Sequence, residues 1–293
     1  MFLPKHRLFC KFSVCRVSRV SARPHGWWTL TLRPERRELL LHDASTRAVG
    51  LQIIEPKAAR AVALNRLRDE IFVGSLESYR SNLTFDEDPC GQSPSDLADM
   101  SVFRELLARF RNQVGGSDDR SLVSFWSQHY FAGLLLPFTA FCLLAGTDIP
   151  LDARTMRVSF CPIKGTPRQF HFSPAASARP APVLLEAILH EQVAPMVALL
   201  KRHGGLSARL FWENAGCYLA WILGEIAQTH PGSRATAMAL LGDTQWTRTA
   251  GPAIEHLKCA TLKGEVAARR LCCLRYGVPG YARCPGTCPL AES

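Results

Sequence analysis

The longest apolar stretch of the chain places the strongest constraint on its fold. Residues 130–146 form 17 consecutive positions in which almost every side chain is hydrophobic. Pro137 and Thr139 interrupt the stretch, which is too short and too broken for a membrane span and favours a helix buried in a protein core. The wider segment Ser121–Ala145 indicates a pair of helical stretches, because a proline at position 137 is expected to kink or break a helix.

Residue spacing elsewhere predicts further helices and one pair of strands. Helical patterns with start and stop signals cover residues 56–73, 102–114, 182–202, 207–228 and 233–242. Thr155–Cys161 and Arg168–Ser173 alternate as strands do, and the Pro- and Gly-containing segment between them predicts a hairpin turn. Residues 176–182 are expected to form a linker. We therefore expect a mainly helical α+β fold, with a small antiparallel β element in the middle and a C-terminal cysteine-rich metal loop.

Charge and composition divide the chain into three segments. Residues 1–47 contain ten Lys and Arg side chains against three acidic ones, a net charge of +7 out of +10 for the whole chain. The rest of the chain is nearly neutral, which argues against a nucleic-acid-binding surface. We expect residues 1–50 to be a basic N-terminal extension, either disordered or the result of a start codon assigned too far upstream. Residues 51–263 are expected to form the helical body, and residues 264–293 the cysteine-rich segment.

Four of the eleven cysteines lie in the last 22 residues. Cys272 and Cys273 are adjacent, ten residues follow, and Cys284 and Cys288 complete the pattern. Eleven cysteines in a chain without a recognisable export signal indicate a reducing compartment, where clustered cysteines bind metal more often than they form disulfides. A metal site is therefore the first interpretation of this tail.

The spacing leaves three kinds of site open. Structural zinc prefers two knuckles of the C-x₂₋₄-C type, and adjacent Cys272 and Cys273 do not form one because neighbouring side chains diverge. A two-iron cluster is wider, and adjacent sulfurs can serve it. Four unrelated core cysteines are the third alternative, although a segment rich in Gly, Pro and Arg is a poor core segment. The spacing favours the iron–sulfur cluster over zinc and over no metal.

The tail resembles the C-terminal signature of the FhuF-type siderophore-iron reductases. That signature places a Cys-Cys pair, ten residues and a second cysteine pair at the extreme C-terminus. The likeness includes Arg270 before the pair, residues 274–276 after it and residues 288–290 at the end. The segment Leu210–Ala215 also resembles the Trp-x-Asn stretch of this family.

The resemblance implies a [2Fe–2S] cluster bound by Cys272, Cys273, Cys284 and Cys288. It implies a ferric-siderophore reductase, which reduces Fe(III) to Fe(II) by one electron so that the iron leaves the siderophore. The expected partners are a ferric siderophore, in the first place of the hydroxamate type, and a separate electron donor, since the chain has no nucleotide-binding motif. No nucleic acid is expected. The expected compartment is the bacterial cytoplasm, with peripheral association at the inner membrane compatible with it.

A rival interpretation comes from a different class of protein. The chain could instead be a non-redox siderophore-binding or assembly protein in which the tail holds a structural Cys₄ zinc site. Four arginines near the cysteines have two interpretations as well. They either offset the negative charge of a cluster or are ordinary solvated side chains; they are Arg269, Arg270, Arg275 and Arg283.

The tail departs from the family pattern at one point. Three residues separate Cys284 from Cys288, where the family has two. A loop that contains Pro and Gly can absorb an inserted residue. If one ligand were displaced instead, Cys259 would be the nearest spare sulfur in sequence, although a core cysteine is the simpler interpretation of that residue.

Overall fold

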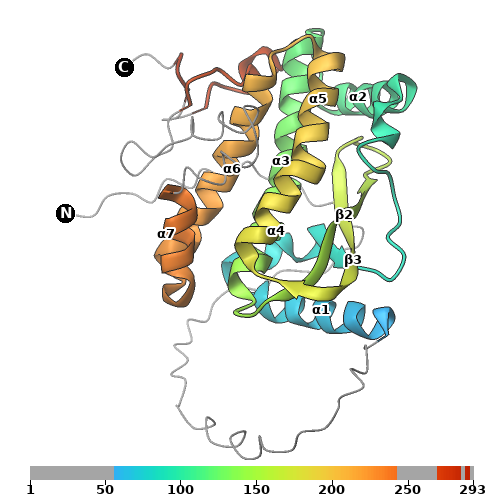
Figure 1. Cartoon of the computed structure of the whole chain (residues 1–293). Coiled ribbons are helices and arrows are strands. Elements are labelled where there is room, and N and C mark those ends of the chain that lie inside the picture. Colours follow the sequence, from blue (N-terminus) through green and yellow to red (C-terminus); the bar gives the residue numbers. More distant parts are fainter. Residues whose placement is uncertain (1–55, 243–268, 285–287, 291–293) are drawn as a thin grey trace, which may run out of the picture. The chain divides into compact units, whose positions relative to one another are not determined.

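The computed structural model describes residues 56–242, 269–284 and 288–290, all within one compact unit, Ile54–Ser293. The predictions for residues 1–50, for Cys259 and for the start of the cysteine-rich segment lie outside the described residues. In chain order the elements are α1 (Lys57–Ile71), η1 (Gly74–Asn82), β1 (Leu83–Phe85), η2 (Asp96–Ala98), α2 (Met100–Val114), α3 (Asp119–Leu144), β2 (Ile149–Phe160), β3 (Pro167–Arg179), α4 (Ala181–Ile188), η3 (Leu189–Val193), α5 (Ala194–Gly204), α6 (Ala208–Thr229), η4 (Pro231–Ser233), α7 (Arg234–Gly242) and η6 (Arg275–Gly277). The expected mainly helical α+β class is confirmed (Figure 1).

Helix α3 carries the apolar stretch and lies among α5, α6 and the sheet (Figure 1). Residues 130–143 are all buried, which confirms the core-helix interpretation. The expected break at Pro137 is wrong, because the helix continues through this residue to Leu144. A proline inside a helix costs about 3 kcal/mol. Packing on all sides of the helix, such as that of Phe138 against Phe172 in β3, offsets this cost.

The middle of the chain forms a three-stranded mixed sheet in the order β1–β3–β2. Strands β2 and β3 are antiparallel, as expected, and Val158 lies opposite Phe170. Both strands are longer than expected, and the linker expected at residues 176–182 is mostly the end of β3. Strand β1 pairs in parallel with β3 and was not expected. Its three residues are too few for an alternating pattern to be recognised.

The β2–β3 hairpin is fastened to the helices at its turn. Gly165 has a φ of 62°, and an added Cβ there would lie 2.1 Å from the carbonyl oxygen of Leu106 in α2. The indole Nε1 of Trp126 in α3 donates a hydrogen bond of 2.8 Å to the Gly165 carbonyl oxygen. The turn therefore requires glycine both for its backbone conformation and for the close approach of α2.

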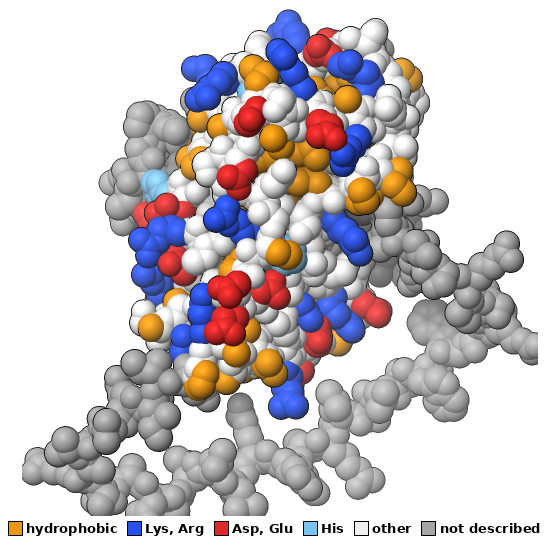
Figure 2. Space-filling view, turned by 90° about the vertical axis from the view of Figure 1, so that its right-hand side faces the viewer, with side chains coloured by type: hydrophobic (Ala, Val, Ile, Leu, Met, Phe, Trp, Pro, Cys, Tyr) orange, Lys and Arg blue, Asp and Glu red, His pale blue; other side chains and the backbone are white. Residues whose placement is uncertain are grey.

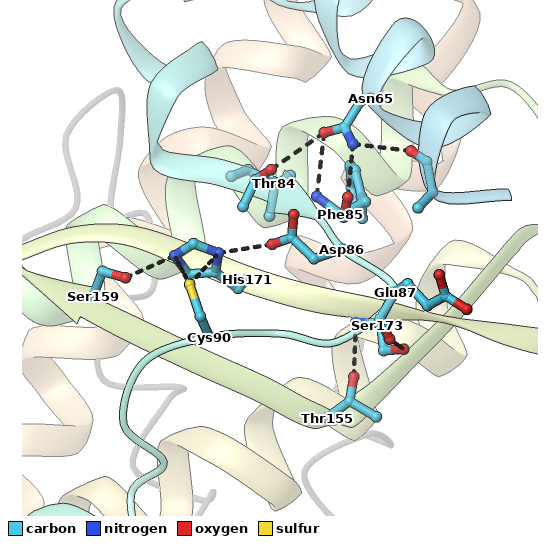
Figure 3. A network of polar contacts seen from close by, with 12 residues as sticks. Asn65, Thr84, Phe85, Asp86, Glu87, Cys90, Thr155, Ser159, His171 and Ser173 are labelled. Atoms are coloured by element: carbon cyan, nitrogen blue, oxygen red, sulfur yellow. Dashed lines mark hydrogen bonds and ion pairs between the residues drawn. The ribbon is translucent and has the colours of Figure 1, made fainter. Parts of the chain in front are cut away.

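A polar network joins the segment after β1 to the other two strands (Figure 3). His171 of β3 lies between two partners, with Nδ1 2.7 Å from Asp86 Oδ2 and Nε2 2.8 Å from Ser159 Oγ. The Sγ of Cys90 lies 3.7 and 3.8 Å from the two ring nitrogens. These contacts satisfy the polar atoms of a buried imidazole, so the network holds the strands and the following segment together.

Two helical stretches of the described residues are long and apolar enough to cross a membrane, Asp119–Leu144 and Ala181–Gly204. In the fold, 83% and 56% of their most apolar windows are buried. The second stretch comprises α4, η3 and α5 and contains one π-helical turn, so the helix expected at residues 182–202 is present with a local distortion. Core helices satisfy the same criteria of length and composition, so these two properties do not by themselves assign either stretch to a membrane.

Charged side chains of both signs are mixed on the face of the molecule shown in Figure 2. Lys and Arg side chains alternate there with Asp and Glu side chains. The described residues on this face therefore do not form the continuous basic field that follows a phosphate backbone.

Candidate metal centre

The cysteine-rich tail packs against the N-terminal half of α3 and against α6 (Figure 1). Val278 is almost completely buried, and the ring of Tyr281 packs on Phe125 of α3 with ring centres 4.5 Å apart. A Cβ added to Gly277 would lie 2.3 Å from Ser121 Oγ, so the tail backbone touches the helix. The position of the tail is thus set by packing on the body of the protein.

Two buried side chains of the helices bind the backbone around the adjacent cysteines. Glu213 Oε1 in α6 accepts hydrogen bonds from the backbone N–H groups of Arg270 and Leu271, the latter at 2.8 Å. Ser124 Oγ in α3 donates a hydrogen bond of 2.7 Å to the carbonyl oxygen of Cys273. Leaving such a buried group without its partner costs about 1–3 kcal/mol, so these bonds specify where the cysteine pair lies.

The backbone turns sharply directly after the cysteine pair. Leu274 has a φ of 58° and is the one non-glycine residue with positive φ in the described part of the chain. This conformation costs about 1 kcal/mol. The turn directs the N–H of Leu274 to Cys272 Sγ at 3.4 Å, and the N–H of Arg275 hydrogen-bonds to Cys273. Hydrogen bonds to cysteine sulfur stabilise the thiolate and are one means by which proteins tune iron–sulfur clusters.

The four sulfur atoms lie in two pairs. Each pair joins one of the two adjacent cysteines to one of the two later cysteines. The Sγ atoms of Cys273 and Cys284 are 3.4 Å apart. The thiol of Cys272 interacts with those of Cys273 and Cys288. Among the residues that the structure describes, no group of three or more His, Cys, Asp or Glu side chains is arranged to hold one metal ion.

The two thiols of the closer pair have opposite pKa shifts. The hydrogen bond from the Cys284 thiol lowers the pKa of Cys273 far below its ordinary value despite burial, and the charge of Arg269 adds to this effect. The same hydrogen bond raises the pKa of Cys284. Burial raises the pKa of Cys272. Cys273 is therefore the first of the three to become a thiolate, the form of cysteine that binds metal.

The closer sulfur pair has a separation suited to binding one metal atom. Two thiolates bound to one tetrahedral metal by bonds of about 2.3 Å lie about 3.7 Å apart. The 3.4 Å between Cys273 and Cys284 is close to this separation. A [2Fe–2S] cluster takes two protein ligands on each iron, so two sulfur pairs match its needs in chemistry and in number.

The structure separates the four arginines near the cysteines by their exposure. Arg269 is buried, with 9% of its surface exposed, Arg275 is partly buried, and Arg270 and Arg283 are exposed. The Nη1 of Arg269 donates a hydrogen bond of 2.6 Å to Asn214 Oδ1 in α6. The interpretation as solvated side chains fits Arg270 and Arg283, whereas charge compensation fits Arg269.

A fifth cysteine near the centre was not expected from the sequence. Cys217 lies one helical turn after Glu213 in α6, and its sulfur accepts a hydrogen bond from the Arg269 guanidinium. The i, i+4 spacing from Glu213 was the available signal, because residues so spaced share one helix face. Trp212, in contrast, is a core residue with 1% of its surface exposed.

Sequence comparison supplies an independent test of the resemblance. The family model described as ferric iron reductase FhuF-like transporter matches residues 124–260. The chain is related to the FhuF-like proteins. The ferric siderophore reductase of Escherichia coli (strain K12) is 24% identical over 217 residues, which cover 68% of this chain and 76% of that protein. The resemblance drawn from the tail and the Trp-x-Asn stretch is thereby confirmed.

The family match covers the helices that hold the tail of this FhuF-like chain, and it ends before the tail itself. It starts at Ser124, which binds the Cys273 backbone, and includes Glu213 and Asn214 of α6. The choice of the four cysteines as ligands therefore stays a prediction that rests on their spacing and their arrangement in the structure.

Proposed function

We propose that this FhuF-like chain is an oxidoreductase that reduces the iron of a ferric siderophore from Fe(III) to Fe(II). The relation to the family and to the Escherichia coli reductase supports siderophore-iron reduction in general. We propose in addition that a [2Fe–2S] cluster bound by Cys272, Cys273, Cys284 and Cys288 serves the reaction. The observation that carries this is the meeting of these thiols in two pairs beside a buried arginine.

The crossed pairing supports a specific division of the ligands. Cys273 and Cys284 would bind one iron, and Cys272 and Cys288 the other. In that arrangement Cys284 and Cys288 do not share a metal atom, so the extra residue between them does not have to meet the geometry of a knuckle. When bound, such a cluster supplies one electron at a time at a potential set by its surroundings.

The reaction needs one electron and breaks no covalent bond of the siderophore. A separate donor is oxidised by one electron, and the ferric ion is reduced by one. Hydroxamate oxygens are hard ligands, which hold Fe(III) much more tightly than Fe(II), so reduction loosens the complex. The donor is a second molecule in this proposal because the sequence contains neither a dinucleotide fingerprint nor a P-loop.

The surface beside the tail is the proposed place of contact with the siderophore. Cys272, Cys284 and Cys288 are only partly buried, and Tyr276 and Leu290 are each 45% exposed. We propose that a bulky chelate approaches the sulfurs from this side. The bacterial cytoplasm is the compartment that we propose, because it keeps such thiols reduced.

Metal analysis of the full-length chain tests the proposal. Protein purified without oxygen is expected to be coloured and to contain about two irons and two sulfides per chain. Dithionite should bleach it, and the bleached protein should reduce a ferric hydroxamate. A colourless chain with one zinc ion would overturn the cluster and favour the rival zinc site, since zinc has no redox chemistry.

Substitution of single cysteines tests the ligand assignment. Cys273→Ser and Cys284→Ser are each expected to abolish the visible absorption, because each removes half of the closer sulfur pair. Cys259→Ser is the control and is expected to retain it. Loss of absorption in the control but not in the other two would show that the ligands are misassigned.

A further inference from the structure

We propose that Arg269 raises the reduction potential of the centre by holding a buried positive charge against the Cys273–Cys284 pair. This inference rests on the proposed function and adds a residue that tunes it. Arg269 directly precedes Arg270, where the likeness of the tail to the family signature begins, and 9% of the surface of Arg269 is exposed. Its guanidinium interacts first with Cys217, and also with Cys273 and Cys284, and a buried cation is costly without such partners. The position of Arg269 is therefore suited to a neighbouring negative charge, which the four thiols provide as thiolates.

Asn214 holds the guanidinium in place. Its Oδ1 accepts the hydrogen bond of 2.6 Å from Arg269 Nη1. Its Nδ2 donates to Ser127 Oγ at 2.9 Å and to the carbonyl oxygen of Ser124 at 3.3 Å. Since Nδ2 has acceptors on α3, the amide oxygen is left to face Arg269. All four residues are buried, so the orientation of the charge is part of the packed core.

The other charged groups near the sulfurs differ from Arg269 in burial or in position. Arg275 also acts on Cys273 and Cys284, but it is partly exposed, with its guanidinium 5.7 Å from the ring centre of Tyr281. The Glu213 carboxylate carries the charge opposite to that of Arg269, yet its Oε1 accepts hydrogen bonds from two backbone N–H groups, and it contributes to the raised pKa of Cys217. Arg269 is thus the buried cation near these sulfurs, and it interacts with Cys217 as well as with Cys273 and Cys284 of the closer pair.

The direction of the effect follows from elementary electrostatics. Four thiolates and two sulfides leave a cluster negatively charged, and one added electron increases that charge. A fixed positive charge nearby stabilises the reduced form more than the oxidised form, which raises the potential. Water and salt screen an exposed charge much more strongly than a buried one. Arg269 should therefore matter more than its exposed neighbour Arg270, although both are arginines next to the same pair.

The experiment is a spectroelectrochemical titration of the intact protein in four forms. These are the wild type, Arg269→Gln, Arg269→Lys and the control Arg270→Gln, each with its cluster content checked by absorption. Arg269→Gln is expected to lower the midpoint potential, with a shift at least about twice that of Arg270→Gln. Arg269→Lys keeps the charge and is expected to recover most of the difference. Equal shifts in the two Gln variants, or no recovery by Lys, would overturn the inference.

Three further outcomes remain decisive. If Arg269→Gln folds without a cluster, Asn214→Ala tests the same contact, because it releases the guanidinium from its buried position. A lower potential in Asn214→Ala supports the inference, and an unchanged potential overturns it. A wild-type protein that holds no iron and no sulfide would remove the proposed function, and this inference with it. A wild-type cluster whose midpoint potential does not change when Arg269 is substituted would overturn this inference alone.

Discussion

His129 is a residue whose protonation links stability to pH. Although part of the residue touches solvent, its ring packs against those of Phe110 and Phe125, with ring centres 5.4 and 4.9 Å away. Burial first, and then the charges of Lys164 and Arg275, lower its pKa to about 4. The unfolded chain has an ordinary value of about 6.5 and so takes up a proton first as the pH falls. His129 therefore contributes stability that is present above about pH 6.5 and lost toward pH 4.

We expect this contribution of His129 to appear when the free energy of unfolding is measured with denaturant at two pH values. Between pH 7 and pH 5 the wild type should lose about 2 kcal/mol through this group. The loss should be smaller in His129→Gln, which cannot take up the proton. His230→Gln, at the end of α6, serves as the control and should keep the wild-type loss. An equal loss in His129→Gln would mean that other groups cause the pH dependence.

At the same scale, the sequence identified the cysteines but could not rank the arginines. Cys272, Cys273, Cys284 and Cys288 stand out by type and spacing alone. The four nearby arginines are chemically identical, and only the path of the folded chain makes Arg269 buried and Arg270 exposed. Cys217 was missed for the same reason, because its approach to the tail depends on the contact between α6 and a distant segment.

At the scale of elements, the β2–β3 hairpin turn requires glycine at position 165 for two separate reasons. Gly165→Ala would place a Cβ 2.1 Å from the Leu106 carbonyl oxygen, in a backbone conformation with a φ of 62°. We expect a loss of about 2–4 kcal/mol in the free energy of unfolding, since the clash with α2 adds to the conformational cost.

Gly146→Ala provides a matched control for this prediction. Gly146 has a φ of 67°, but an added Cβ there would meet nothing within 4 Å. Its substitution should cost about 1 kcal/mol, which is the conformational term alone. Urea unfolding of both variants separates the two terms. Equal losses in the two variants would show that the contact with α2 does not matter.

The helices and the hairpin could be predicted because each carries its own periodic pattern. The elements that were mistaken are those in which tertiary packing outweighs a local signal. Pro137 does not break α3, because residues on every side of the helix are buried. The expected linker at residues 176–182 mostly continues β3, because a neighbouring strand is available to pair with it. Strand β1 exists only through its pairing with β3.

At the scale of the whole molecule, the described core is built almost entirely from residues 61–240, and of the described tail residues only Cys273, Val278 and Arg269 are as deeply buried. We therefore expect the body to fold without the metal centre. A variant with all four tail cysteines replaced by serine should keep its helical circular dichroism and a cooperative thermal transition, with a loss of at most about 3 kcal/mol. Loss of the cooperative transition would instead indicate that the tail is a structural staple, as in a zinc site.

The sequence by itself determined the family likeness of this protein and the type of most of its elements. Thiol number and spacing, helical periodicity and the apolar stretch are local properties, which can be read without knowing where the chain goes. The tertiary structure alone decided how the sulfurs pair, because Cys273 meets Cys284 only after the tail folds back on itself. It also decided that Glu213, Asn214 and Ser124 hold that tail. These contacts join segments that are distant in sequence, so no local pattern encodes them.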